Sequence, residues 1–311
     1  MLKVSDYTGP IDKPGLYRMP AEVYHKGPAV GPEFSNSLAR ALLTTSPLHA
    51  WTMHPKLNPN WRSQDSERRM EIGQVAHRLV LDAGQPIDIL EFKDFRTKDA
   101  QAARIDSESR NRIPVLRCDY ERAEGLAEPM RNAVENFMGA AIADCLREVV
   151  ILWQGKNGVW RKAMPDIATP DLRRLCDVKS TATSVHPAAC SKRVYDAMYH
   201  IQAVHYSEGC DALDPEGIGR REFGFLFAET SEPFAVSPPI LLSEAGRAMG
   251  AEQLHIASDK FASCLKTDRW PGYSDQPHVA KPPPWVLSQW AERSMSDETL
   301  NPEIDAKYAN V

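Results

Sequence analysis

Residues 148–179 read EVVILWQGKNGVWRKAMPDIATPDLRRLCDVK, and this stretch decides the fold that we expect. Residues 149–153 and 159–164 are mainly apolar and flank a Gly-Lys-Asn-Gly turn, which predicts a β-hairpin. Residues 172–179 contain a further apolar run, which predicts a third strand. The sequence therefore indicates three strands close together in the chain.

The segments around these strands alternate between helical and extended patterns. Helices are expected over residues 37–45, 66–84 and 120–146, then 187–209 and 243–267, and strands over 223–228 and 234–242. This order predicts an α/β fold with a central mixed β-sheet flanked by helices. We expect one domain over residues 1–276 with a helical N-terminal part, and a C-terminal extension over residues 277–311 that contains the sequence KPPPW.

Charge and cysteine content restrict the class of protein. The chain has 37 basic and 42 acidic residues and a net charge of −5, which argues against a simple nucleic-acid clamp but leaves room for a nuclease. None of the six cysteines forms a Cys-x-x-Cys pair, so zinc and iron–sulfur sites are not expected. Without a signal peptide or an apolar run near the roughly 20 residues of a membrane span, we expect a cytoplasmic protein with reduced thiols and no membrane contact.

The carboxylates on the predicted strands indicate a metal site. Asp177 and Lys179 are two residues apart, so both side chains project from one face of a strand. If Asp166 lies on the neighbouring strand, its negative charge repels that of Asp177 unless a cation lies between them. Carboxylates are ligands for Mg²⁺, and a lysine supplies a point charge beside a phosphate. This set suits a metal-dependent phosphodiesterase.

An Asp-x-Lys pair alone is a weak motif, because both residues are common at strand ends. Glu148, directly before the first strand, strengthens the metal interpretation. His77, in a Gly-x-x-x-His spacing on a predicted helix, strengthens it further, although a single helix histidine is more often structural. An imidazole can complete a site whose other ligands are oxygens.

The predicted helix over residues 187–209 carries a polar and aromatic stripe. Tyr195, Tyr199, Gln202 and Tyr206 follow a spacing of i, i+4, i+7 and i+11. Such a stripe can be an ordinary half-buried helix face. The alternative is that the helix presents Gln202 and the tyrosines to the metal site and to the DNA backbone.

Together these residues resemble the PD-(D/E)xK nuclease superfamily, and most closely its exodeoxyribonuclease VIII (RecE-like) family, which is related to lambda exonuclease and RecB nuclease domains. The resemblance covers about residues 14–276. The motifs that carry it are Gly73-Gln-Val-Ala-His77, Glu148, Arg161-Lys-Ala-Met-Pro-Asp166, Asp177-Val-Lys179 and Gln202-Ala-Val-His-Tyr206. Two positions depart from the family pattern, which has Arg-Pro-Asp where this chain has Met164-Pro165-Asp166, and Thr where it has Ser180.

The resemblance implies a role for each of these residues. It implies that Asp166, Asp177 and the backbone carbonyl of Val178 bind Mg²⁺ or Mn²⁺, with His77 and Glu148 at a first or second metal position. It further implies that Lys179 orients and helps to deprotonate the attacking water. Gln202 and Tyr206 would complete the catalytic set by supporting the lysine and the scissile phosphate.

The resemblance also implies an activity and partners. The activity is a Mg²⁺-dependent DNA exonuclease that degrades the 5′ strand of linear double-stranded DNA and leaves 3′ overhangs for phage-type recombination. The partners are double-stranded DNA ends and a single-strand annealing recombinase, and the expected assembly is a homo-oligomeric ring of three or four subunits. An endonuclease or single-strand nuclease with the same core remains an alternative, as does a non-catalytic DNA-binding scaffold.

Overall fold

The computed structural model describes residues 2–62 and 72–296. The chain forms two compact units, Met1–Gly272 and Tyr273–Val311. The strands of the first unit are β1 (Val4–Asp6), β2 (Gly15–Arg18), β3 (Glu33–Phe34), β4 (Ile87–Leu90), β5 (Ile113–Leu116), β6 (Leu146–Arg147), β7 (Val150–Gln154), β8 (Trp160–Ala163), β9 (Ile167–Ala168), β10 (Arg174–Thr181), β11 (Glu222–Glu229) and β12 (Ile240–Leu241). Its helices are α1 (Ala21–Lys26), α2 (Asn36–Thr44), α3 (Pro47–Met53), α4 (Ile72–Leu81), α5 (Lys98–Ser109), α6 (Arg117–Met138), α7 (Pro187–Asp196), α8 (Tyr199–Leu213) and α9 (Glu244–Thr267), with short 3₁₀ turns η2 (Ile142–Asp144) and η3 (Pro215–Gly217).

The strands form mixed sheets, which confirms the expected α/β class. One sheet has the order β1-β2-β7-β8-β3 and another the order β12-β11-β10-β9-β6. Strands β10 and β11 pair in parallel over their full length, whereas β7 and β8 form the predicted antiparallel hairpin. A parallel pair needs a crossover connection, and helices α7 and α8 supply it between β10 and β11.

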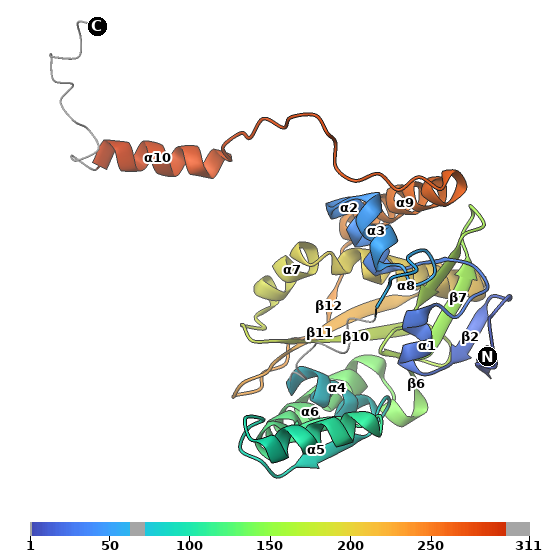
Figure 1. Ribbon diagram of the computed structural model, residues 1–311, viewed down its shortest axis with the longest axis vertical. Coiled ribbons are helices and arrows are strands. Elements are labelled where there is room, and N and C mark those ends of the chain that lie inside the picture. Colours follow the sequence, from blue (N-terminus) through green and yellow to red (C-terminus); the bar gives the residue numbers. More distant parts are fainter. Residues whose placement is uncertain (1, 63–71, 297–311) are drawn as a thin grey trace, which may run out of the picture. The chain divides into compact units, whose positions relative to one another are not determined.

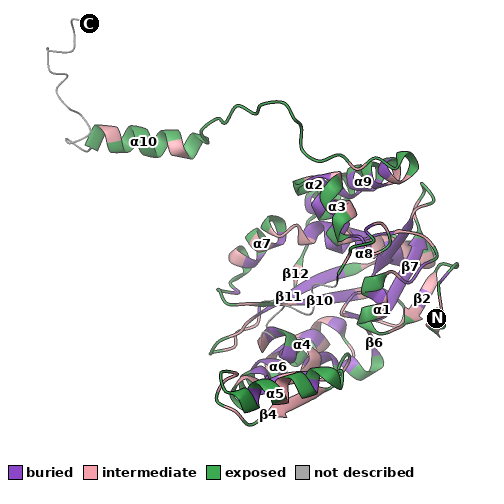
Figure 2. Cartoon of the chain, in the orientation of Figure 1, coloured by how far each residue is buried: buried purple, intermediate pink, exposed green. Residues whose placement is uncertain are grey.

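Helices cover both faces of the β10–β11 pair (Figure 1). On one face, Cys176 and Val178 of β10 pack in a core with Val75 of α4 and with residues of α6. On the other face, Leu175 packs with Tyr206 of α8. Both faces are buried in Figure 2, and the strand therefore carries buried residues in succession rather than in strict alternation.

The predicted helix over residues 187–209 is interrupted, and this expectation was wrong. Helix α7 ends at Asp196 and α8 begins at Tyr199, because Met198 adopts a left-handed backbone conformation with φ of 56°. The helical spacing of residues 195–206 contains no Gly or Pro at the break, so the sequence gives no signal for it. As a consequence, Tyr195 lies on a different helix from Tyr199.

Other departures concern short elements. The strand expected over residues 234–242 is reduced to β12 and an isolated bridge between Ala228 and Val236. The weakly patterned N-terminal region forms β1, β2, α1 and β3, and strands β2 and β3 pair with β7 and β8, which are distant in the sequence. Residues 66–71 of the expected 66–84 helix lie outside the described residues, and the rest forms α4, which ends at Leu81 rather than at residue 84.

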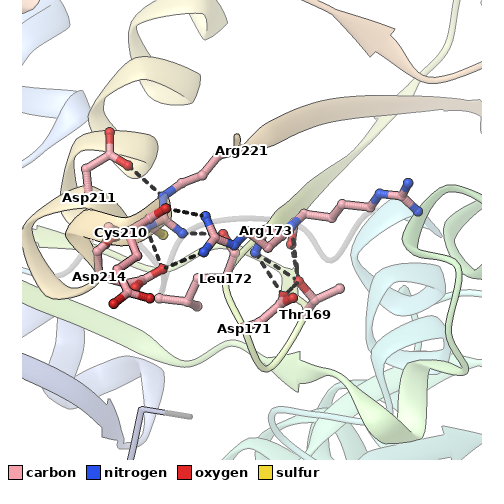
Figure 3. A network of polar contacts seen from close by, with 10 residues as sticks. Thr169, Asp171, Leu172, Arg173, Cys210, Asp211, Asp214 and Arg221 are labelled. Atoms are coloured by element: carbon pink, nitrogen blue, oxygen red, sulfur yellow. Dashed lines mark hydrogen bonds and ion pairs between the residues drawn. The ribbon is translucent and has the colours of Figure 1, made fainter. Parts of the chain in front are cut away.

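An arginine clasp joins the start of β11 to the end of α8 (Figure 3). The side chain of Arg221 is 3% exposed, and its Nε atom lies 2.6 Å from Oδ1 of Asp211. One terminal nitrogen donates to the carbonyl of Leu172 at 2.6 Å, and the other pairs with Asp214 at 3.0 Å. The clasp therefore fixes the turn before β10 relative to α8, the helix that faces the candidate site.

The described part of the second unit contains helix α10 (Pro284–Ser296), in which no residue is buried. In residues 2–62 and 72–296, no helix is both long enough and apolar enough to cross a membrane.

Candidate active site

Strand β10 places Asp177 and Lys179 on one side of the sheet, as their spacing predicts. Asp177 is 2% exposed, and its Oδ1 atom forms an ion pair with Nζ of Lys179. Its Oδ2 atom accepts a hydrogen bond from Nε2 of Gln202 on α8. Lys179 also lies over the ring of Tyr199, with 4.7 Å between Nζ and the ring centroid. A cation–π contact of this kind favours the charged ammonium and limits its movement.

Asp166 lies between β8 and β9, and its side chain contacts strand β10. Its Oδ2 atom accepts a hydrogen bond of 2.7 Å from the backbone N–H of Val178. In an extended strand, the N–H and C=O of one residue point to the same side, so the Val178 carbonyl also points toward the Asp166 side of β10. The structure thus brings together the two carboxylates and the carbonyl of the predicted ligand set.

Helix α4 brings His77 to the same place from the opposite face. The Nε2 atom of His77 lies 3.1 Å from Oδ2 of Asp166, and the two side chains are 26% and 17% exposed. The core packing of Val75, Ala76 and Val80 against the sheet holds α4 there. His77 therefore lies beside Asp166 in the candidate site.

Glu148 occupies a strained backbone position between β6 and β7. Its φ of 49° lies in the left-handed region, which a non-glycine residue seldom adopts. Its N–H donates to the carbonyl of Asp166 at 3.0 Å, which ties its backbone to the site. Strain of this kind at a position held by surrounding hydrogen bonds is common at functional sites.

Helix α8 supplies the two remaining predicted residues. Gln202 and Tyr206 are both buried, and the Gln202 side chain also hydrogen-bonds that of Tyr206. Tyr206 is therefore linked to Asp177 through Gln202. Gln202 supports Asp177 rather than Lys179 directly, which differs from the role expected for it.

The charges in the site are strongly coupled. Burial by itself would lower the pKa of His77, but Asp166, with Glu148 and Asp177, raises it to about 9. Burial opposes ionisation of Asp166 as well, but His77 and Lys179 hold the pKa of this carboxyl below its ordinary value. At neutral pH the imidazolium and the carboxylate therefore form an ion pair.

Asp177 has the opposite shift. Burial, followed by the negative charge of Asp166, raises the pKa of Asp177 to about 6 against the effect of Lys179. Burial also raises the pKa of Glu148. The contribution of Asp166 to the raised pKa of Asp177 shows that the two carboxylates repel one another.

The donor set fits Mg²⁺ in its chemistry. Mg²⁺ commonly binds one or two carboxylates and completes its shell with water and substrate phosphates. Asp166, Asp177 and the Val178 carbonyl offer hard oxygen ligands, and the Oδ1 atom of Asp177 is paired with the ammonium of Lys179. Among residues 2–62 and 72–296, no three His, Cys, Asp or Glu side chains are arranged to hold a metal ion together. In this arrangement the carboxylates contact His77 and Lys179 instead.

A polar groove lies apart from these carboxylates. Its volume is about 810 Å³, and it is lined by residues along α2, by α3 and by the segment up to Arg62. Lys162 of β8 and Met198, which precedes Tyr199, line it too, whereas Asp166, Asp177 and Lys179 do not. The side chain of Ser35 caps α2 by accepting from the N–H of Leu38.

Two features of this region escaped sequence reasoning. Tyr199 was expected only as one member of a stripe, whereas its ring contacts Lys179. Lys162 lies in the Arg161–Asp166 motif, yet no role was expected for it. It is 7% exposed, and its Nζ atom donates to the carbonyl of Tyr24 at 2.6 Å. A lysine within an apolar strand was the available signal for a special environment.

Comparison with protein families identifies the chain. Residues 39–282 match the family described as PDDEXK-like domain of unknown function (DUF3799). The chain belongs to this family. The match confirms the expected PD-(D/E)xK superfamily and does not single out its RecE-like branch.

Solved structures show a similar fold. A putative exonuclease from Eubacterium rectale is 12% identical, with a TM-score of 0.50 over 83% of this chain and 93% of that one. A phage-related exonuclease from Haemophilus somnus 129PT is 11% identical, with a TM-score of 0.29 over 67% of this chain and 100% of that one. No curated protein sequence matches the chain. At these identities the first likeness supports the fold, and the second carries no weight.

Proposed function

We propose that this protein is a Mg²⁺-dependent deoxyribonuclease that hydrolyses phosphodiester bonds from the ends of linear double-stranded DNA. The observation that carries the proposal is the convergence of Asp166, Asp177 and Lys179 beside His77. The family supports a PD-(D/E)xK fold, and a structure with the same fold is named a putative exonuclease. Mn²⁺ is the alternative cation, because it accepts the same oxygen ligands.

The residues of the candidate site would have two separate roles in hydrolysis, namely binding of the cation and orientation of the attacking water. Asp166, Asp177 and the Val178 carbonyl would hold the cation, with Glu148 and His77 beside them. Mg²⁺ would supply Lewis-acid polarisation of the phosphate and a more acidic water. The ammonium of Lys179, held between Asp177 and Tyr199, would orient the attacking water and stabilise charge on the phosphate.

The polar groove supports a path for DNA. Arg40, Arg62 and Lys162 line it together with hydroxyl and amide side chains, which contact phosphate oxygens, although Glu33 and Asp196 line it too. Contacts of this type read the backbone rather than the bases. We therefore expect binding that weakens steeply with salt and shows little sequence preference.

Two finer proposals rest on the resemblance to RecE-like nucleases. One is degradation of the 5′ strand to leave 3′ overhangs, in concert with a single-strand annealing recombinase. The other is a ring of three or four subunits around DNA. Light scattering of the purified protein tests the ring, and a mass of about one chain would argue against it.

The test compares two DNA substrates in the presence of Mg²⁺. A linear duplex with a 5′-phosphate and a closed circle of the same sequence are incubated with the protein. Loss of the linear DNA alone supports an end-dependent exonuclease. Nicking of the circle would favour the endonuclease alternative, and binding without cleavage of either DNA would favour a non-catalytic scaffold.

The variant Asp177→Asn serves as the inactive enzyme in this test, because it removes one negative charge with little change of shape. Asp259→Asn is the matched control, since Asp259 is an exposed residue on α9 whose ion pair is with His255. Activity should be lost in the first variant and retained in the second.

A further inference from the structure

Helix α4 and strand β10 approach each other closely at Gly73 and Ser180. A Cβ atom added to Gly73 would lie 2.0 Å from Oγ and 2.3 Å from Cβ of Ser180. Non-bonded carbon atoms are normally separated by about 3.5–4.0 Å. Rotation of Ser180 about χ1 moves Oγ but leaves Cβ in place. A side chain at position 73 would therefore force the helix and the strand apart.

This close approach lies on the face of α4 that carries the site histidine. Gly73 and His77 are four residues apart, so they occupy the same face of the helix, one turn from each other. Ser180 directly follows Lys179 on β10. The two elements share a packed core that includes Val75 on α4 and Val178 on β10. Because one turn of helix connects Gly73 to His77, a change in the distance between α4 and β10 at Gly73 would also displace His77.

We infer that the contact between Gly73 and Ser180 is a positioning device for the candidate active site. It sets the separation of α4 and β10 at which Nε2 of His77 reaches Oδ2 of Asp166, 3.1 Å away. Gly73 is not one of the predicted ligands or catalytic residues. Its role is steric, because the absence of a side chain permits the approach. The effect on cleavage rests on the proposed function, whereas the effect on His77 does not.

A double-mutant cycle tests the contact. Gly73→Ala adds the clashing carbon, and Ser180→Gly removes the Oγ and Cβ atoms with which it clashes. After the second change, the closest Ser180 atom to the added carbon would be its Cα, at 3.8 Å, which is ordinary van der Waals contact. The account predicts that Gly73→Ala alone loses function and that the double variant recovers it.

The primary measurement is the imidazole signal of His77 in protein labelled with ¹⁵N-histidine, assigned by its loss in His77→Gln. Gly73→Ala should shift this signal away from its wild-type position, and adding Ser180→Gly should return it. DNA cleavage should fall at least tenfold in Gly73→Ala and recover at least partly in the double variant. Gln74→Ala, on the exposed side of the same helix, is the matched control and should change neither property.

The possible outcomes separate the two claims. If the wild-type protein cuts no DNA, the proposed function fails, while the His77 signal still tests the contact. A wild-type His77 signal in Gly73→Ala would overturn the inference. So would a folded double variant in which the signal stays displaced. If Gly73→Ala does not fold, the double variant decides: recovery of folding and of the His77 signal supports the contact, and failure to recover overturns it.

Discussion

The Nε2 atom of His77 lies 3.1 Å from Oδ2 of Asp166, although the two residues come from a helix and a strand connection that are far apart in the sequence. The same carboxylate oxygen accepts a hydrogen bond from Val178, the residue between Asp177 and Lys179. Asp166 therefore connects α4 to β10. The predictions below follow from this connection and from the burial around it.

Lys179 should be essential for cleavage but not for folding. Replacing it with Met removes the ammonium beside the proposed phosphate, while the apolar stem can still pack against Tyr199. The cleavage rate should fall by roughly 10²–10⁴-fold, as is typical when a proton-transfer group is lost. Single-turnover digestion measures it, and circular dichroism checks the fold. Lys260→Met, an exposed change on α9, is the control, and near wild-type cleavage by Lys179→Met would remove this residue from the site.

His77 should determine how much Mg²⁺ the protein needs for cleavage. His77→Ala removes the cationic partner of Asp166, so the pKa of that carboxyl should rise and the site should lose a candidate ligand. We expect the Mg²⁺ concentration needed for half-maximal cleavage to increase by about tenfold, within the range for loss of a group that supports a metal ligand. A titration of activity against Mg²⁺ measures this change. An unaltered Mg²⁺ dependence would contradict this prediction and would indicate that His77 has only a structural role.

Metal binding should weaken in mild acid. The pKa of Asp177 is raised to about 6, so this group takes up a proton as the pH falls through that value. A protonated carboxyl is a poor ligand for Mg²⁺. Calorimetric affinity for Mg²⁺ should therefore be higher at pH 7.5 than at pH 5.5, and Asp177→Asn should reduce the difference. Equal affinity of the wild-type protein at both pH values would contradict the assignment.

Two buried histidines outside the site should make the fold sensitive to acid. Burial lowers the pKa of His54 to about 4 and that of His205 to about 3. The unfolded chain binds these protons near pH 6.5, whereas the folded protein excludes them. Their contribution to stability is complete above about pH 6.5, decreases as the pH falls below that value, and is fully lost at about pH 4 for His54 and about pH 3 for His205.

Urea unfolding at pH 7.5 and pH 5.5 measures this effect. Each histidine should contribute a loss on the order of 1 kcal/mol per pH unit below its unfolded pKa. His205→Gln should show a smaller difference between the two pH values than the wild type. His255→Gln, which changes an exposed side chain, should leave the difference unaltered. An equal pH dependence in His205→Gln and wild type would exclude this explanation.

The arginine clasp should contribute strongly to stability. Arg221→Met leaves Asp211 and Asp214 without their main cation and removes the side-chain donor of the Leu172 carbonyl. The free energy of unfolding should fall by about 2–4 kcal/mol, since the guanidinium is buried but the carboxylates are partly exposed. Lys192→Ala, which breaks an exposed ion pair on α7, should cost less than about 1 kcal/mol. Denaturant melts that show equal losses would contradict this difference.

The sequence predicts correctly those elements that depend on a local residue pattern. The hairpin of β7 and β8 follows from apolar runs and a Gly-bounded turn, and the placement of Asp177 and Lys179 follows from the two-residue period of a strand. The close packing of His77 on Asp166 came only from family resemblance. No periodicity in the sequence indicates which helix turn meets which strand.

The parts that escaped prediction depend on tertiary contacts. The left-handed conformation of Met198 ends a helix that the local sequence pattern would continue. Glu148 adopts the same left-handed backbone conformation, and because it is not a glycine, the sequence does not predict this conformation. Strand β1 and its neighbours are too short for a period to be recognised. The hydrogen bonds of β2 to β7 and of β3 to β8, rather than local preference, determine the structure of this region.

The central claim is that Asp166, Asp177 and Lys179 form a Mg²⁺-dependent nuclease site. The most direct measurement follows the release of nucleotides from a 5′-phosphorylated linear duplex by wild-type protein and by Asp177→Asn, with Mg²⁺ and with excess EDTA. The account predicts release only by the wild-type protein with Mg²⁺. Equal release by Asp177→Asn, or release that persists in EDTA, would contradict it.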